Sequence, residues 1–104
     1  MLGKTVIVTM DRKLGTRHPK HGYIYPINYG YVEGIMAPDG DFQDAYVLGP
    51  SEPLDTFEGR IIAIVHRKND VEDKWVVANE SYTVEQIERA IHFQEQYFDH
   101  EIIM

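Results

Sequence analysis

Residues 23–44 hold the densest group of side chains that could carry chemistry. Their sequence is YIYPINYGYVEGIMAPDGDFQD, in which four of the first nine residues are tyrosines. A tyrosine offers an apolar ring and one hydroxyl, so it can line a pocket and hold an oxyanion without adding negative charge. So many tyrosines in a short stretch are atypical of a surface loop and indicate a pocket for an anionic ligand.

Three carboxylates follow within six residues, at Asp39, Asp41 and Asp44. Such carboxylates repel one another, so they need either an open, solvated loop or a cation among them. Oxygen ligands in a chain without cysteine favour Mg²⁺ or Mn²⁺ over Ca²⁺. An EF-hand loop starting at Asp39 would need Gly at its sixth position and Glu at its twelfth, where the chain has Asp44 and Pro50. The three carboxylates alone leave a metal site and a solvated turn both open.

The elements that must position these residues are short strands joined by loops. The β-branched and apolar runs predict strands over residues 4–10, 45–49, 60–66 and 74–78. The segments predicted to be irregular are residues 11–31 and 50–59, and a strong turn signal covers residues 37–41.

The last part of the chain carries the signals of one helix. Thr83 and Gln86 form a capping-box pattern at its start. The apolar residues that recur at helical spacing are Val84, Ile87, Ile91 and Phe98. Several short strands followed by one helix predict a mainly β fold, in which a small, closed or partly closed barrel has the C-terminal helix packed on it.

Composition limits the classes of protein that the chain can be. Its 104 residues suit one domain, residues 1–104, with a single core. Seventeen acidic residues against ten basic ones give a net charge of −7, which disfavours nucleic acid as a partner. No apolar run reaches the roughly 18 residues of a membrane span. The absence of cysteine excludes disulfides and thiolate metal sites, and we expect a cytoplasmic location.

Two motifs in the chain resemble those of the soluble family I inorganic pyrophosphatases. Residues 25–30, YPINYG, and residues 39–44, DGDFQD, are similar to the Y-P-x-N-Y-G and D-x-D-x-x-D stretches of that family. Residues 72–74, EDK, and residues 92–97, HFQEQY, resemble its acidic-then-lysine segment and its terminal-helix motif. The resemblance implies a five-stranded OB-like barrel, self-association into a homo-oligomer, and Mg²⁺-dependent hydrolysis of pyrophosphate to two phosphates.

The resemblance also implies roles for particular residues. The metal ligands would be Asp39, Asp41 and Asp44. Asp41 would in addition accept the proton of the attacking water, which Tyr29 would support. The residues that bind the phosphate-containing substrate would be Arg17, Lys20, Tyr25, Lys74 and Tyr97.

The chain departs from the family pattern at three positions. Arg67 stands where an ungapped alignment places an acidic residue, and Asp70 can replace it only if the hairpin is re-registered. Phe98 stands where a lysine is usual, and Phe42 stands where a proline is usual. The first expectation of function is metal-dependent hydrolysis of pyrophosphate or a related phosphoanhydride. The alternative is a catalytically weakened module that binds phosphate, nucleotide or metal and serves in regulation or assembly.

Overall fold

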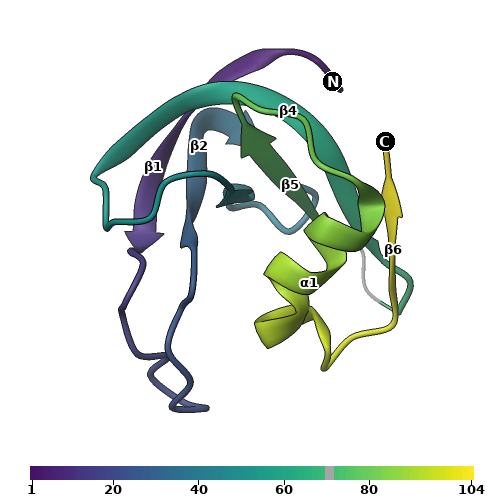
Figure 1. The fold of residues 1–104 in the computed structure, drawn as a ribbon. Coiled ribbons are helices and arrows are strands. Elements are labelled where there is room, and N and C mark those ends of the chain that lie inside the picture. The colour runs from purple at the N-terminus through teal and green to yellow at the C-terminus, as the bar shows by residue number, and fades with distance from the viewer. Residues whose placement is uncertain (70–71) are drawn as a thin grey trace.

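The computed structural model describes residues 1–69 and 72–104, so Asp70 lies outside the described residues. Strands and one helix follow each other along this part of the chain (Figure 1). They are β1 (Thr5–Arg12), β2 (Asn28–Met36), β3 (Phe42–Val47), β4 (Thr56–Arg67), β5 (Asp73–Ala78), α1 (Val84–Glu95) and β6 (His100–Ile103).

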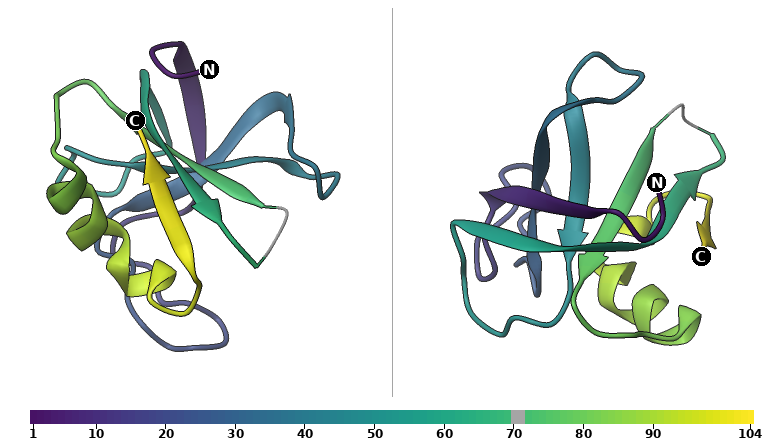
Figure 2. Two further views of the ribbon diagram at one scale, coloured as in Figure 1. Left: turned by 90° about the vertical axis from the view of Figure 1, so that its right-hand side faces the viewer. Right: turned by 90° about the horizontal axis from the view of Figure 1, so that it is seen from above.

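Five of the strands close into a barrel. Their order is β1-β2-β3-β5-β4, and β4 pairs back onto β1 to close the ring. Strand β4 reaches both neighbours because it is 12 residues long: its first part, from Thr56 to Arg60, pairs with β1, and its later part pairs with β5. Strand β6 pairs with the far end of β4 and lies outside the ring (Figures 1 and 2). The predicted mainly β barrel with a C-terminal helix is therefore confirmed.

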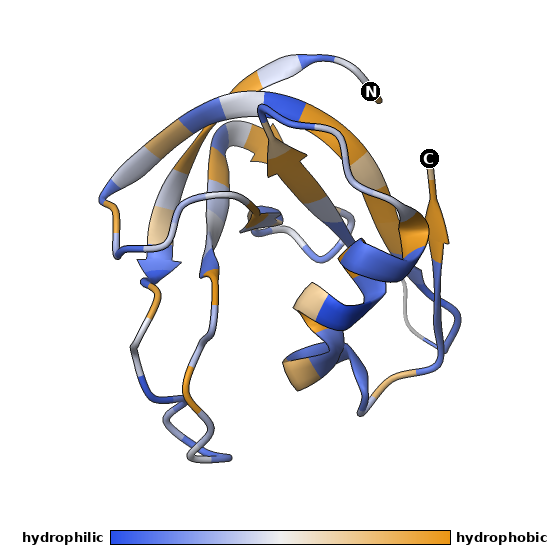
Figure 3. Cartoon of the chain, viewed as in Figure 1, coloured by the Kyte–Doolittle hydropathy of each residue, from blue (hydrophilic) through white to orange (hydrophobic). Residues whose placement is uncertain are grey.

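The strands bury side chains on both of their faces. One cluster fills the barrel with residues from all five of its strands, including Val8, Val32 and Val47. A second cluster lies between the barrel and the helix, where Ile87 and Ile91 of α1 are completely buried. Strand β5 contributes to both clusters, which explains why it reads as a continuous apolar run (Figure 3).

Helix α1 starts where the sequence predicts. The Thr83 side chain accepts a hydrogen bond from the Gln86 backbone, and the Gln86 side chain accepts one from the Thr83 backbone, which completes the capping box. The helix ends at Glu95, so Phe98 follows it instead of extending its apolar stripe. No helix among the described residues is long and apolar enough to cross a membrane.

The predicted irregular segments contain strands that the sequence pattern did not reveal. Strand β2 begins at Asn28 and β4 begins at Thr56, both inside segments predicted to be irregular, and β3 begins at Phe42, three residues before the strand predicted at residues 45–49. Strand β6 was not predicted at all. The start of β2 carries few β-branched residues, and the start of β4 and all of β6 pair with strands that are distant in sequence. Local propensity therefore gives little indication of these strand segments.

Candidate functional site

A cavity of about 400 Å³ opens between the C-terminal end of α1, the barrel and the connection from β1 to β2. Its cationic side chains are Arg12, Arg67 and Lys74, and its carboxylates are Asp11 and Asp44. Its tyrosines are Tyr23, Tyr25, Tyr29 and Tyr97, and the histidines His18 and His21 lie among them. The cavity therefore combines positive charge with neutral hydroxyl groups, as the tyrosine-rich segment predicts.

The structure brings part of the predicted site together in this cavity. The predicted residues that line it are Tyr25, Tyr29, Asp44, Lys74 and Tyr97. Those that do not line it are Arg17, Lys20, Asp39 and Asp41. The assigned roles of all of them stay predictions.

Asp39 and Asp41 lie on the exposed turn that joins β2 to β3. An Asp39 carboxylate oxygen accepts a hydrogen bond from the backbone N–H of Asp41 at 3.0 Å, which stabilises the turn locally. Asp44 is separated from them because it belongs to β3, where it pairs with Tyr31 of β2. In the part of the chain that the structure describes, no three His, Asp or Glu side chains are grouped so that they could hold a metal ion.

Arg17 and Lys20 lie on the connection from β1 to β2, outside the cavity. The Arg17 guanidinium donates a hydrogen bond to the Gly22 carbonyl at 2.7 Å, so it closes its own loop. The Lys20 side chain is exposed, and its backbone N–H donates to Nδ1 of His18 at 3.1 Å. Arg12, the last residue of β1 and so just before this connection, lines the cavity in their place.

Lys74 lies at the centre of an ion-pair cluster on the cavity wall. Strands β3 and β5 run parallel with Ala45 beside Trp75, so Asp44 and Lys74 lie next to each other. The Lys74 ammonium is 2.6 Å from an Asp44 carboxylate oxygen and also contacts a Glu72 oxygen. Burial by itself lowers the pKa of Lys74, but Tyr29, Asp44 and Glu72 outweigh it and raise the pKa above its ordinary value. Lys74 is therefore a permanently charged group with only 4% of its surface exposed.

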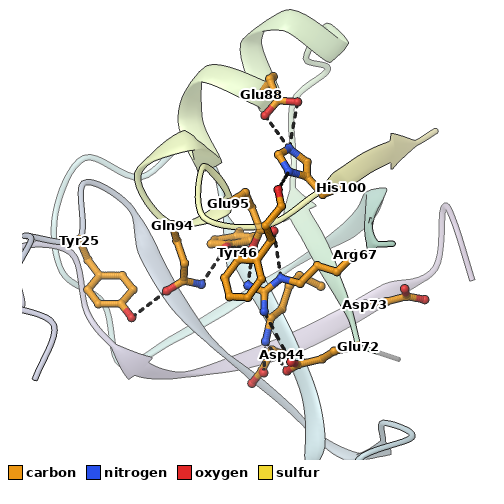
Figure 4. Close-up of polar contacts among 12 residues, drawn as sticks. Tyr25, Asp44, Tyr46, Arg67, Glu72, Asp73, Glu88, Gln94, Glu95 and His100 are labelled. Atoms are coloured by element: carbon orange, nitrogen blue, oxygen red, sulfur yellow. Dashed lines mark hydrogen bonds and ion pairs between the residues drawn. The ribbon is translucent and has the colours of Figure 1, made fainter. Parts of the chain in front are cut away.

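A second cluster connects the end of β4 to the end of α1 (Figure 4). The Arg67 guanidinium donates two hydrogen bonds to the Glu95 carboxylate, at 3.0 and 2.7 Å. The Tyr46 hydroxyl donates to the same carboxylate at 2.5 Å and accepts a hydrogen bond from the Gln94 amide at 2.8 Å. Glu95 is completely buried, and the hydrogen bonds from Arg67 and Tyr46 offset the cost of removing its carboxylate from water.

Three tyrosines of the cavity, Tyr23, Tyr25 and Tyr29, have raised pKa values and keep their protons at neutral pH. Burial raises the pKa of Tyr29 above its ordinary value, and the Asp44 carboxylate adds to that effect. Burial also raises the pKa of Tyr23 to about 12. The hydroxyls of Tyr23 and Tyr25 both donate to the Gln94 side-chain oxygen, at 3.0 and 3.1 Å. These residues therefore present neutral hydroxyl groups to a ligand.

Sequence reasoning did not identify several residues of the cavity as part of a site. The sequence marks Arg67 only as a departure from a family pattern. It gives no site role to Gln94, which lines the cavity, or to Glu95, which binds Arg67. The helical spacing does indicate that both side chains face inward. Gln94 follows Ile87 by seven residues and Glu95 follows Ile91 by four, so they lie on the same face of the helix as these buried isoleucines. The histidines His18 and His21 had no strand or helix to indicate their position.

The described structure is similar to solved inorganic pyrophosphatases. The enzyme from Ehrlichia chaffeensis matches with a TM-score of 0.73 at 17% sequence identity, covering 97% of this chain and 85% of that one. Those from Helicobacter pylori and Thermus thermophilus match with TM-scores of 0.68 and 0.66, both at 16% identity, covering 90% and 96% of this chain and 75% and 80% of theirs. No protein-family model matches the chain, and no curated protein matches its sequence.

These likenesses define the fold. The chain has a fold similar to that of the family I inorganic pyrophosphatases, as the two sequence motifs imply. The agreement extends over nearly the whole chain, so it includes the barrel, the helix and the strands that carry the cavity.

The side chains described in the cavity do not fit the divalent metal that the resemblance implies. Asp44, which lines the cavity, and the neighbouring Glu72 direct their carboxylates at the Lys74 ammonium. Glu72 also lies 3.6 Å from Arg67, and Asp11, the other carboxylate of the cavity, lies 4.0 Å from Arg12. Carboxylates that are each paired with a protein cation leave no position of unbalanced negative charge for Mg²⁺. Asp39 and Asp41, which would complete the ligand set, lie on the turn outside the cavity.

Proposed function

We propose that this chain binds inorganic pyrophosphate, or a closely related phosphoanhydride, in the cavity and hydrolyses it. The observation that carries the proposal is the gathering of Arg12, Arg67 and Lys74 with tyrosine hydroxyls around one cavity, in a chain whose net charge is −7. The fold shared with inorganic pyrophosphatases supports the same conclusion.

The chemistry of a phosphoanhydride explains why these residue types are suitable. Its oxygens are negatively charged and repel a nucleophile, so charge neutralisation by fixed cations lowers the barrier to hydrolysis. Lys74 and Arg67 supply such charges, and the hydroxyls of Tyr29 and Tyr97 can donate to the remaining oxygens. Asp44 is the carboxylate of the D-x-D-x-x-D motif that reaches the cavity, so we propose it as the acceptor of the proton from the attacking water.

A second candidate function is binding without turnover. The specific observation that favours it is the ion pair between Asp44 and Lys74, at 2.6 Å, because a carboxylate oxygen that accepts a hydrogen bond from the ammonium is not free to accept the proton of a water. In that case the chain would be a module that holds a phosphate-containing molecule for regulation or assembly. The self-association and the cytoplasmic location expected from the sequence remain predictions.

One experiment separates these functions. Phosphate release from pyrophosphate and from nucleoside triphosphates would be measured in EDTA, in Mg²⁺ and in Mn²⁺, with calorimetric binding of pyrophosphate in parallel. Release that is lost in Asp44→Asn, while that variant still binds pyrophosphate, supports hydrolysis with Asp44 as the base. Binding without release in any condition supports the second candidate, and the absence of both contradicts the proposal.

The same assay tests the sequence-based role of Asp41. An Asp41→Asn variant would lose release in Mg²⁺ if the three carboxylates of the motif assemble around a metal during the reaction. It would match the wild type if Asp41 serves only in the exposed turn, where its backbone N–H bonds to Asp39. Because Asp41 and Asp44 belong to the same motif, each variant is the matched control of the other.

A further inference from the structure

Arg67 occupies a position where the resemblance to pyrophosphatases implies a carboxylate, and the structure shows how that change is accommodated. Its guanidinium is bound through two of its nitrogens to Glu95, at 3.0 and 2.7 Å. The Phe98 ring covers one face of the guanidinium, whose carbon lies 3.7 Å from the ring centroid. Phe98 in turn occupies another position where the chain departs from the family. These two departures are therefore in direct contact and form one unit.

The unit holds the guanidinium in a single orientation. Glu95 is itself fixed by the Tyr46 hydroxyl at 2.5 Å, and neither Glu95 nor Tyr46 exposes any surface. Arg67 exposes only 5% of its surface, and it lines the cavity. A guanidinium that is already ordered loses little further entropy when it binds a ligand, which favours a charge-assisted contact.

One nitrogen of Arg67 remains available to a ligand. Nε and one terminal nitrogen bond to Glu95, whereas the other, Nη1, lies 3.6 Å from a Glu72 oxygen, which is longer than a hydrogen bond. The second Glu72 oxygen contacts the Lys74 ammonium. Arg67 and Lys74 therefore flank one carboxylate, and a phosphate group that contacts both cations would take the place of Glu72 between them.

We infer that Arg67 is a fixed cationic ligand for the phosphate anion, and that with Lys74 it lets the cavity bind this anion without a divalent metal ion. The inference rests on the proposed function, since it concerns the same cavity and the same class of ligand. It follows from the donor set: the carboxylates of Asp44 and Glu72 are held by Lys74 and Arg67, and those cations can make contacts with phosphate oxygens themselves. Arg67 is in this sense a binding residue that the sequence motifs do not include.

The test is calorimetric binding of inorganic pyrophosphate to the full chain in EDTA. The wild type should bind, and Arg67→Gln should weaken binding about tenfold or more, because a charge-assisted contact is lost. Arg67→Lys should fall between them, since it keeps the charge and loses the planar fork. The control is Arg60→Gln, on the same strand but outside the cavity and exposed, which should bind as the wild type does.

A folding defect is separated from a binding defect by a second variant. Arg67→Gln leaves the buried Glu95 without its partner, whereas Arg67→Gln combined with Glu95→Gln removes both charges, and circular dichroism shows which variants are folded. A folded double variant should also bind weakly. Wild-type affinity in either folded variant contradicts the role of Arg67. Binding that requires Mg²⁺ contradicts the inference and leaves the proposed function intact, whereas no binding in EDTA or in Mg²⁺ contradicts the proposed function itself.

Discussion

Asn28 is a residue of the YPINYG motif whose side chain serves the fold and lies outside the cavity. It is completely buried, and its side-chain oxygen accepts hydrogen bonds from the backbone of Leu14 at 2.9 Å and of Leu54 at 3.2 Å. Its amide donates to the Glu52 carbonyl at 3.0 Å. Asn28 therefore joins the connection between β1 and β2 to the connection between β3 and β4. The first of these connections also carries cavity residues.

Replacing Asn28 should destabilise the whole domain. We expect Asn28→Ala to lower the free energy of unfolding by about 1–3 kcal/mol, because buried backbone groups lose their partners. The control is Asn79→Ala, since Asn79 is exposed and donates a single hydrogen bond, to the Glu58 carbonyl at 3.1 Å. Urea denaturation of both variants measures the difference. Equal losses of stability in the two variants would contradict the larger contribution expected of the buried hydrogen bonds of Asn28.

At the scale of single residues, the sequence indicated better which tyrosines and which lysine would line the cavity than which carboxylates would do so. Tyr25, Tyr29 and Lys74 line the cavity because each is held by the barrel or packed against it. The spacing of a D-x-D-x-x-D motif does not determine where a turn ends and a strand begins, so it could not show that Asp44 alone reaches the cavity. The pairing of Arg67 with Glu95, 28 residues apart, depends on how β4 and α1 pack and has no local signal.

Strands β1 and β2 lie too close together at Gly30 to admit a side chain. A Cβ atom added there would lie 2.0 Å from the Thr9 carbonyl oxygen and 2.8 Å from the Met10 Cα, both of them backbone atoms. The glycine of the YPINYG motif is therefore required by the closed barrel. The neighbouring Tyr29 can then reach the cavity from the same strand.

Gly30→Ala should destabilise the barrel by about 3 kcal/mol or more, since the overlap is with backbone that cannot move aside. The control is Gly40→Ala on the exposed turn, where nothing lies within 4 Å of the added atom. Gly40 has a φ of +90°, so alanine there should cost about 1 kcal/mol in backbone strain alone. Thermal unfolding of the two variants compares the effects. A loss for Gly30→Ala no larger than for Gly40→Ala would contradict the close approach.

Helix α1 and strand β6 are connected by His100. Its ring nitrogens contact the Glu88 carboxylate at 2.8 Å and the Phe98 carbonyl at 2.9 Å (Figure 4). Burial lowers the pKa of His100, but the Phe98 carbonyl and the Glu88 carboxylate outweigh it and raise the pKa above its ordinary value of about 6.5. Since the folded state binds this proton more tightly, the contact stabilises the fold below pH 6.5 and loses its effect as the pH rises through the folded pKa.

The stability that His100 provides should therefore decrease with rising pH. The melting temperature of the wild type should exceed that of His100→Gln at pH 6, and the difference should shrink by pH 8.5. Glu88→Gln removes the partner carboxylate, so it should abolish the same pH-dependent part of the difference. A difference that stays constant from pH 6 to 8.5 in the His100 variant would mean that protonation of this ring does not contribute.

The elements differ in how well the sequence predicts them, for a physical reason. The start of α1 depends on contacts between Thr83 and Gln86, which are three residues apart, so it could be predicted to the residue. Strand β6 has four residues and is stabilised by pairing with β4, more than 30 residues earlier in the chain. Its sequence alone carries no comparable signal, because the partner strand determines whether it forms.

At the scale of the whole molecule, the cavity belongs to no single element. Its walls come from the end of β1 with the following connection, from β2, β3, β4 and β5, and from the end of α1. Arg67, Lys74 and Tyr29 come from three different strands, so they are assembled only when the barrel closes. A ligand that binds this cavity therefore binds the folded chain and not the unfolded one.

Pyrophosphate should consequently stabilise the entire domain. A ligand at 100 times its dissociation constant adds about 2.7 kcal/mol to the free energy of unfolding. In a domain of this size that corresponds to a rise in melting temperature of roughly 10–20 °C. We expect this rise in EDTA for the wild type and for Arg60→Gln, and about half of it or less for Arg67→Gln at the same ligand concentration, since a tenfold loss of affinity leaves about 1.4 kcal/mol. Sodium chloride at equal ionic strength controls for general salt effects, because a chloride ion has no oxygens with which to contact Arg67 and Lys74 as a phosphate group does. An equal rise with chloride would mean that the salt screens the acidic surface as a whole and that pyrophosphate does not act in the cavity.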